Sequence, residues 1–362
     1  MVEQKQKREH KYLLFELTKA CHNNCVFCYN VWKEDNDYPQ HELSTKDVIA
    51  LLEKLFKRSS CQHIALTGGE PLLKDGIFEI AAFMASNNVM PILITNGKLL
   101  TESTARKCIQ NGIKYFEVSL HSDKREIHDE LVGRGGSFEE VIDAIMNTKR
   151  LGGHLNTVFV ATKKNIHTFK GFVELNALLR VEWILFNRVA CGGSCMADWQ
   201  SLAPSPAQVQ QALEEGASVA EKYRIGLSAG VQVQPCLIDL SKCKNVRTGF
   251  CPLNDPVSED SYFAIDPAGN LRMCNRSKTI LGNLLERSFD DIVQSREVEE
   301  FGRAIPDFCL DCRLAKACAG GCKADAVSYF GTLAKSDPYL EMWKEQARKI
   351  REHDLDTRLT VR

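Results

Sequence analysis

The chain has 362 residues, 44% of them hydrophobic, with 46 Lys and Arg against 47 Asp and Glu and a net charge of −1. This balance excludes the strongly basic character typical of nucleic-acid-binding proteins, and no apolar run approaches the length of a membrane span. The charged N-terminal segment carries no apolar stretch, so we expect a cytoplasmic protein that contacts no membrane. Fifteen cysteines in such a chain indicate metal ligation rather than disulfides.

The first predicted strand, Tyr12–Leu17, leads into three cysteines, Cys21, Cys25 and Cys28, at C-x3-C-x2-C spacing. A structural zinc takes four protein ligands, and iron–sulfur clusters are also held by sets of thiolates. Because no fourth cysteine lies nearby in the sequence, the triplet indicates a metal centre with one iron left open for another ligand. The end of a strand is also where α/β barrels carry their chemistry. The alternative is part of a zinc ribbon, or an unrelated loop.

Strand-like and helix-like segments alternate from Tyr12 to about Arg188. Further strands are predicted at His63–Thr67, Met90–Thr95, Tyr115–Ser119, Asn156–Thr162 and Glu182–Asn187, and helices at Thr45–Arg58, Gly76–Ser86, Thr101–Asn111, Phe138–Leu151 and His167–Leu179. Ser44 and Ser137 are predicted as helix N-caps. The alternation predicts an α/β fold, a partial (β/α)6 TIM-like barrel with a long bridging helix over Ser205–Tyr223, in a first domain of residues 1–235.

The ends of the second and third predicted strands carry further candidate site residues. Gly68 and Gly69 allow a ligand to approach the backbone closely, and Glu70 offers an acceptor for an ammonium group. Thr95 and Asn96 follow at the end of the next strand. Since the carboxyl ends of parallel strands meet at one edge of the sheet, we expect these residues beside the cysteine triplet.

The triplet, with Phe27 before its last cysteine, and the Gly68-Gly69-Glu70-Pro71 segment one strand later resemble the signatures of the radical SAM enzymes. The resemblance implies a four-iron cluster whose open iron binds S-adenosyl-L-methionine, and an electron that cleaves this molecule to a 5′-deoxyadenosyl radical. It implies that Glu70 holds the amino group, Ser119 contacts the ribose and Arg134 pairs with the carboxylate. The cofactor-binding residues expected in this way are Phe27, Gly68, Gly69, Glu70, Thr95, Asn96, Ser119 and Arg134.

The last third of the chain holds a second concentration of cysteines. Cys309, Cys312, Cys318 and Cys322 are spaced C-x2-C-x5-C-x3-C, and they follow Cys243, Cys251 and Cys274. A zinc site would use the four local thiolates and leave the other three without a role. With Gly269 five residues before Cys274, the pattern resembles the SPASM domain. That resemblance implies one auxiliary iron–sulfur cluster on Cys243, Cys251, Cys274 and Cys322, and a second on Cys309, Cys312 and Cys318, in a domain of residues 236–345 before a C-terminal helix or tail at 346–362.

Two positions depart from the SPASM pattern. Leu340 stands where a seventh cysteine is expected, so Asp337, water, Cys236 or the substrate is left to bind the remaining iron of the second auxiliary cluster. The hypothesis that this iron is open competes with a closed, structural cluster beside a buried Leu340. Asn275 replaces the acidic residue that follows the corresponding cysteine in sulfatase maturases, which weakens a sulfatase-maturing interpretation.

The sequence therefore predicts a radical SAM oxidoreductase or peptide-modifying maturase that removes hydrogen from a substrate C–H bond, most simply in a ribosomal peptide being cross-linked, oxidised or epimerised. The alternatives are a dehydrogenase or epimerase of a sugar, cyclitol or nucleotide, a group transfer at an open auxiliary iron, and a non-catalytic iron–sulfur or zinc scaffold. We expect a reducing flavodoxin or ferredoxin as a partner. Because only about eleven residues precede the first strand, we expect any leader peptide to be recognised by a separate partner protein or by the barrel mouth itself.

Overall fold

The structure is a computed structural model that describes residues 10–33, 35, 37–230 and 233–353. Eleven strands form one sheet in the order β11-β10-β9-β1-β2-β3-β4-β5-β6-β7-β8. Neighbours from β1 to β8 run parallel, β9 runs parallel to β1, and β10 is antiparallel to both β9 and β11. The strands are β1 (Tyr12–Thr18), β2 (His63–Gly68), β3 (Met90–Thr95), β4 (Tyr115–Ser119), β5 (His154–Ala161), β6 (Trp183–Arg188), β7 (Gly226–Ala229), β8 (Val246–Thr248), β9 (Ala264–Ile265), β10 (Asn270–Arg272) and β11 (Ile280–Asn283).

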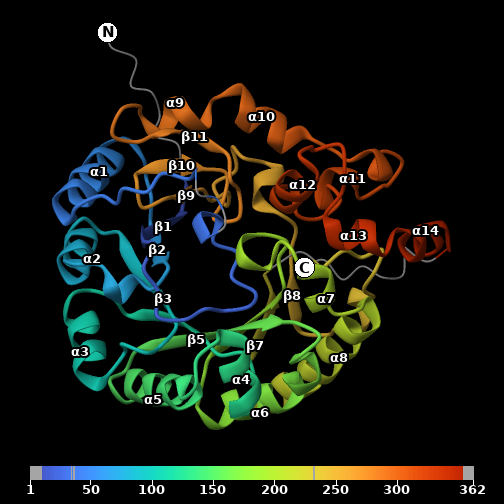
Figure 1. Cartoon of the computed structure of the whole chain (residues 1–362), viewed down its shortest axis with the longest axis horizontal. Coiled ribbons are helices and arrows are strands. Elements are labelled where there is room, and N and C mark those ends of the chain that lie inside the picture. The colour runs from blue at the N-terminus through green and yellow to red at the C-terminus, as the bar shows by residue number, and fades with distance from the viewer. Residues whose placement is uncertain (1–9, 34, 36, 231–232, 354–362) are drawn as a thin grey trace.

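Helices form an outer ring around the curved sheet, as Figure 1 shows for α1, α2, α3, α5, α6 and α8. The α-helices of the first part of the chain are α1 (Thr45–Arg58), α2 (Ile77–Ser86), α3 (Glu102–Gln110), α4 (Arg125–Val132), α5 (Ser137–Arg150), α6 (Phe169–Leu178), α7 (Trp199–Leu202) and α8 (Pro206–Tyr223). Those of the last third are α9 (Phe289–Val293), α10 (Arg296–Arg303), α11 (Ala315–Cys318), α12 (Lys323–Phe330), α13 (Pro338–Met342) and α14 (Lys344–His353). No helix within the described part of the chain is long and apolar enough to cross a membrane.

The expected partial barrel is confirmed in β1 to β6 and the helices between them. The first two strands are nearly continuously buried, as in parallel sheets covered on both faces: every residue of β1 except Tyr12 is buried, as are the four central residues of β2. Ser44 caps α1 as expected, its hydroxyl accepting a bond from the Asp47 amide. The cap expected at Ser137 is wrong: Gly136, at φ +77°, occupies the cap position, and Ser137 lies buried inside α5.

Three buried ion pairs stabilise the last third of the chain. Two of them join it to strands of the barrel, and the third lies within it. Glu16 of β1 pairs with Arg272 of β10, and Arg188 at the end of β6 pairs with Asp337, the N-cap of α13. Arg276 pairs with Asp325 of α12. All six side chains are largely or fully buried, so each charge depends on its partner for compensation. The domain boundaries expected at 235 and 345 stay predictions, because β9 to β11 extend the barrel's own sheet.

Candidate active site

The cysteine triplet lies in a loop after β1 that is attached to the end of α4. The amide of Asn24 donates to the carbonyl of Val132 at 3.0 Å, and the amide of Val26 donates to the carbonyl of Leu131 at 2.9 Å. Between Cys25 and Cys28 the chain turns back on itself, with the Cys28 amide 3.2 Å from the Cys25 carbonyl oxygen. Backbone hydrogen bonds to the end of α4 therefore hold the loop in place, so the approximate position of its thiols does not depend on a bound metal.

The three thiols line one cavity of about 430 Å³ at the carboxyl ends of the parallel strands. The side-chain Nδ2 of Asn96 donates to the sulfur of Cys21 at 3.7 Å. Burial, followed by the neighbouring Cys28 and Cys21 thiols, raises the pKa of Cys25 to about 12. The uncoordinated Cys25 thiol therefore stays protonated, so its binding to a positively charged metal centre would be coupled to loss of its proton.

Gly68 and Gly69 form a close contact with the strand end that precedes the triplet. The Gly69 amide donates to the Thr18 carbonyl at 2.7 Å, and the Glu70 amide donates to the Ala20 carbonyl at 2.7 Å. A Cβ at Gly68, whose φ is +129°, would lie 2.4 Å from the Thr18 oxygen, and one at Gly69 would lie 2.2 Å from the Ala20 oxygen. Only glycine therefore permits this arrangement, which leaves a backbone edge facing the cavity.

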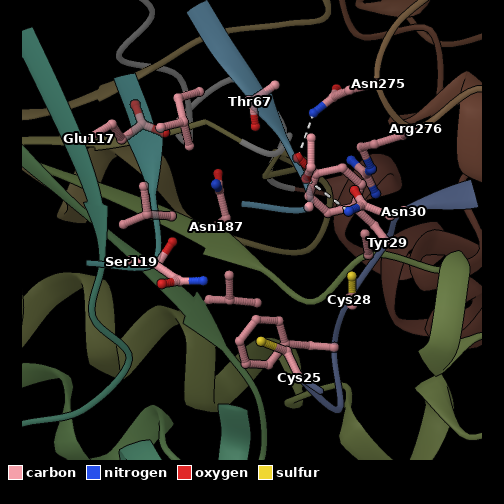
Figure 2. Close-up of a pocket in the computed structure, with 18 of the residues that line it drawn as sticks. Cys25, Cys28, Tyr29, Asn30, Thr67, Glu117, Ser119, Asn187, Asn275 and Arg276 are labelled. Atoms are coloured by element: carbon pink, nitrogen blue, oxygen red, sulfur yellow. Dashed lines mark hydrogen bonds between the residues drawn. The ribbon is translucent and has the colours of Figure 1, made fainter. Parts of the chain in front are cut away.

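Most of the other expected cofactor contacts also line the cavity. Thr95 and Asn96 border it at the end of β3 and Ser119 at the end of β4. Phe27 lines it too, and its ring meets His121 edge-on with centroids 4.6 Å apart. Figure 2 shows Cys25, Cys28 and Ser119 around this space. The fold thus brings the triplet, the glycine pair and three strand ends into one hollow.

Glu70 lies beside the cavity without lining it. Its carboxylate accepts from the Thr95 hydroxyl at 2.8 Å, the Asn96 amide at 2.9 Å and the Leu72 amide at 3.2 Å. The residue is fully buried, and burial raises the pKa of its carboxyl to about 6. In this structure Glu70 ties the end of β3 to the turn after β2, so it controls where Thr95 and Asn96 stand.

We expect Glu70→Gln to weaken S-adenosylmethionine binding by roughly 1–3 kcal/mol, because a buried acceptor becomes a group that also carries donors. Iron content should not change, since no thiol is touched. Calorimetry on the two proteins measures the difference, with Glu79→Gln on the exposed side of α2 as the matched control. Equal affinities would show that Glu70 only stabilises the turn.

Arg134 does not reach the cavity either. Its Nε donates to Asn23 Oδ1 at 2.8 Å, and its guanidinium forms an ion pair with Glu140 of α5. Asn23 itself lies in the cysteine loop and lines the cavity. The expected contact between Arg134 and the cofactor carboxylate stays a prediction, and in this structure the guanidinium positions the loop through Asn23.

Several cavity residues were not anticipated from the sequence. Glu117 of β4 and Asn187 of β6 face the cavity from the sheet, whereas Tyr29, Asn275 and Arg276 line the opposite wall (Figure 2). The side-chain Nδ2 of Asn275 donates to the Tyr29 hydroxyl at 2.7 Å, which joins the cysteine loop to the last third of the chain. The sequence held one signal for two of these residues: Asn275 and Arg276 directly follow Cys274, a predicted cluster ligand.

The last third brings Cys251, Cys274 and Cys322 together near this wall. Burial and then Cys251 raise the pKa of the Cys274 thiol to about 11. Tyr262 lines the cavity close to these three thiols. Burial is the main cause that raises the pKa of its phenol, and the Cys274, Cys251 and Cys322 thiols raise it further. Cys243 stands apart from them: it faces α8, where Gln210 Nε2 donates to its sulfur at 3.6 Å. Its place in the first auxiliary set stays a prediction.

Cys309, Cys312 and Cys318 are the second set of thiols, the predicted ligands of the second auxiliary cluster. The amide of Cys312 donates to the Cys309 carbonyl at 3.0 Å, and the amide of Cys318 donates to the Leu314 carbonyl at 2.8 Å. Across the described residues, no three His, Cys, Asp or Glu side chains converge closely enough to hold a single metal ion. The thiol-rich donor sets are those of iron–sulfur clusters, in which each cysteine binds its own iron.

Comparison with known sequences agrees with this geometry. The radical SAM superfamily profile matches residues 15–175, and the SPASM iron–sulfur cluster-binding domain matches residues 257–313. This chain belongs to the radical SAM superfamily and carries a SPASM domain. Its cofactors are accordingly S-adenosylmethionine, a four-iron cluster and auxiliary iron–sulfur clusters. The expected α/β partial barrel with a C-terminal cysteine-rich region is confirmed.

Three relatives illustrate the range of named activities in similar proteins. The AdoMet-dependent heme synthase of Methanosarcina barkeri is 26% identical over 91% of this chain and 95% of its own. The PqqA peptide cyclase of Rhodopseudomonas palustris is 22% identical over 90% of this chain and 85% of its own. Streptococcus suis SuiB, solved with S-adenosylmethionine, superposes over 92% of this chain and 77% of its own with a TM-score of 0.69 and 16% identity.

Proposed function

We propose that this protein modifies a ribosomally made peptide by radical chemistry, forming a cross-link, an oxidised residue or an epimer. The observation that carries the proposal is the shared cavity, in which the cysteine triplet and the strand ends face residues of the SPASM region. When bound, the cluster and S-adenosylmethionine supply one-electron chemistry that removes a hydrogen atom from an unactivated C–H bond. Cys21, Cys25 and Cys28 hold the cluster, and the backbone edge at Gly68 and Gly69 binds the cofactor.

The walls of the cavity suit a peptide segment. Leu14, Ile94, Val158, Val160 and Leu185 make one side apolar, and these side chains exclude water from the reacting bond. The polar groups among them are amides and a carboxylate, Asn187, Asn275 and Glu117, which match the donors and acceptors of a peptide backbone. Similar proteins named for peptide substrates include the PqqA peptide cyclase, and SuiB has been solved with its precursor peptide SuiA.

The two partners proposed for this reaction are proteins. A reduced flavodoxin or ferredoxin supplies the electron, and a separate leader-binding protein delivers the peptide to the cavity. The first step of the direct test is a search of the neighbouring open reading frames for a short precursor peptide. The second incubates that peptide with reconstituted protein, S-adenosylmethionine and a reductant. We expect deoxyadenosine together with a peptide that has lost hydrogen, or that takes up solvent deuterium if the product is an epimer. Deoxyadenosine without any change in the peptide would contradict the proposal.

Iron-porphyrin modification is a second candidate, favoured by the heme synthase relative and its 95% coverage. The cavity's charges argue against it. A porphyrin brings several carboxylates. Of the cationic residues that line the cavity, Arg188 and Arg276 are already paired with Asp337 and Asp325, so Lys33 is left to face them, and Glu117 adds an acidic group. Titration with Fe-coproporphyrin III, followed by its visible absorbance, separates the two: tight binding and a mass change of the porphyrin favour the second candidate.

Glu117 is our candidate for a direct substrate contact. It lies in the cavity wall, two residues before Ser119 on β4. Burial raises the pKa of its carboxyl to about 7. We expect Glu117→Gln to reduce peptide modification about ten- to hundred-fold, the size of a lost charged hydrogen bond, while deoxyadenosine still forms. Measuring both products in one assay checks this. If both fall together, Glu117 instead supports the cofactor site.

A further inference from the structure

The second auxiliary set has three thiols in the SPASM spacing, and the position of the expected fourth is filled by an apolar side chain. Leu340 lies in α13 with 1% of its surface exposed and packs in the main hydrophobic core. A hydrocarbon side chain supplies no ligand, so any fourth protein ligand comes from elsewhere in the chain.

Two carboxylates lie near Leu340 in the sequence, and both are already engaged. Glu341 accepts from the Ser336 hydroxyl at 2.7 Å and forms an ion pair with Lys344. Asp337 uses both of its carboxylate oxygens. Oδ1 accepts from the Tyr339 amide at 2.9 Å, capping α13. Oδ2 forms the ion pair with Arg188 and also accepts from Gln234 Nε2 at 3.1 Å and the Cys322 amide at 3.0 Å. Moving this carboxylate to an iron would leave the Arg188 guanidinium buried without its counter-charge, which is strongly unfavourable.

Cys236 lies against the same loop from a different part of the chain. The amides of Leu237 and Ile238 both donate to the Gln234 carbonyl, at 2.9 and 3.0 Å, which folds residues 234–238 into a turn. Gln234 fixes this turn to the SPASM region through Asp337, and its Nε2 lies 2.3 Å from where a Cβ on Gly321 would stand. Cys236 is thereby held at the SPASM loop with 8% of its surface exposed.

The loop that Gln234 contacts is the one that carries the second set. The Gly321 amide donates to the Cys318 carbonyl at 3.1 Å, and a Cβ on the adjacent Gly320 would lie 3.3 Å from the sulfur of Cys309. The turn at 234–238 therefore lies against the segment that brings Cys309 and Cys318 together, and Cys236 has Cys309 and Cys312 among its neighbours. By contrast, Cys243 faces Gln210, whose Nε2 donates to its sulfur at 3.6 Å.

Two cations of α14 complete the surroundings. Arg351 lies over the ring of Phe308 at 4.7 Å and donates to its carbonyl, and Lys344 lies over the same ring at 5.0 Å. Both cations lie near the thiol of Cys309, and Arg351 also lies near that of Cys236. Four thiolates with sulfide-bridged irons carry net negative charge, so this position of α14 stabilises a fully thiolate-ligated cluster.

We propose that Cys236 is the fourth ligand of the auxiliary cluster held by Cys309, Cys312 and Cys318. On ligation the Cys236 thiol gives its proton to water and its sulfur donates an electron pair to the iron, with no change in oxidation state. The second auxiliary cluster is then closed by a residue 73 positions before Cys309 in the sequence. The proposal depends on the auxiliary clusters and not on which substrate the enzyme modifies.

The test is Cys236→Ala in the full chain, reconstituted anaerobically with iron and sulfide. Three four-iron clusters give about twelve irons per chain, and loss of one gives about eight. We expect either that loss or a changed electron paramagnetic resonance signal for one auxiliary cluster in the reduced protein. Cys236→Ser, which keeps an oxygen ligand and the local shape, should retain more iron with a shifted reduction potential.

Cys61→Ala is the matched control. Cys61 is also a buried thiol, but its sulfur donates to the His63 carbonyl at the start of β2, far in the fold from the SPASM loop. This variant should keep the iron content and spectra of the unmodified protein. Unchanged iron and unchanged spectra in both Cys236 variants would overturn the proposal, as would loss of the second-cluster signal in Cys243→Ala with Cys236→Ala unaffected.

Discussion

Replacing Cys21, Cys25 and Cys28 together with Ala should abolish deoxyadenosine formation and lower the iron content from about twelve to about eight per chain. The triplet lines the cavity as one set, so no other thiol of that wall can take over its role. The auxiliary clusters should survive, because the cysteine loop is held to α4 by backbone bonds at Asn24 and Val26 that the substitutions leave intact. Iron analysis and chromatography of the reaction products measure both effects.

The control for this experiment is again Cys61→Ala, which removes a buried thiol outside the cavity and should leave both quantities unchanged. Continued cleavage of S-adenosylmethionine by the triple variant would contradict the assignment of the cluster to these residues. Protein that binds zinc and no iron would contradict it too. A fall in iron to about four would instead mean that the SPASM region depends on the cysteine loop, through the contact of Tyr29 with Asn275.

Asp337→Asn should lower the free energy of unfolding by about 3–5 kcal/mol, the cost of leaving one member of a buried ion pair without its partner. The Arg188 side chain is 3% exposed and that of Asp337 is fully buried, so water cannot replace the lost charge. The same substitution alters acceptors for Gln234 and the Cys322 amide. Anaerobic urea unfolding followed by tryptophan fluorescence measures the change.

Two further variants separate charge from shape at this position. Arg106→Ala removes an exposed pair on α3 and should not move the unfolding midpoint measurably. The double variant Arg188→Met with Asp337→Asn removes both charges and should be more stable than Asp337→Asn alone, since no uncompensated guanidinium remains. If the single variant is as stable as the unmodified protein, the pair does not hold the last third of the chain to the barrel.

Much of the barrel could be predicted from local pattern. The strands from β1 to β6 are five to eight residues long. They are nearly continuously buried in β1 and β2 and alternate between buried and more exposed positions in β3, β4 and β6. The helix α1 begins where the sequence indicates because Ser44 caps it. The strands β7 to β11 are two to four residues long and were not anticipated. Such short segments show too little hydrophobic pattern to be predicted as strands. They become strands because their backbones pair with the sheet that is already present. The cap at Gly136 was missed because it requires a positive φ, whereas a serine at a helix start is the usual signal.

Ligand chemistry is a property of residue type and spacing, so the sequence by itself determined the radical SAM triplet, the glycine pair beside it and the thiols of the SPASM region. Which side chains face the cavity is a property of backbone direction, and only the tertiary structure decided that Glu70 and Arg134 stand behind it while Glu117, Asn275 and Arg276 line it. The same is true of Cys236, whose neighbours come from residues more than 70 positions away. Spacing along the chain predicts contacts within one loop. Contacts between loops depend on how the sheet and helices pack, because that packing sets the distance between the loops.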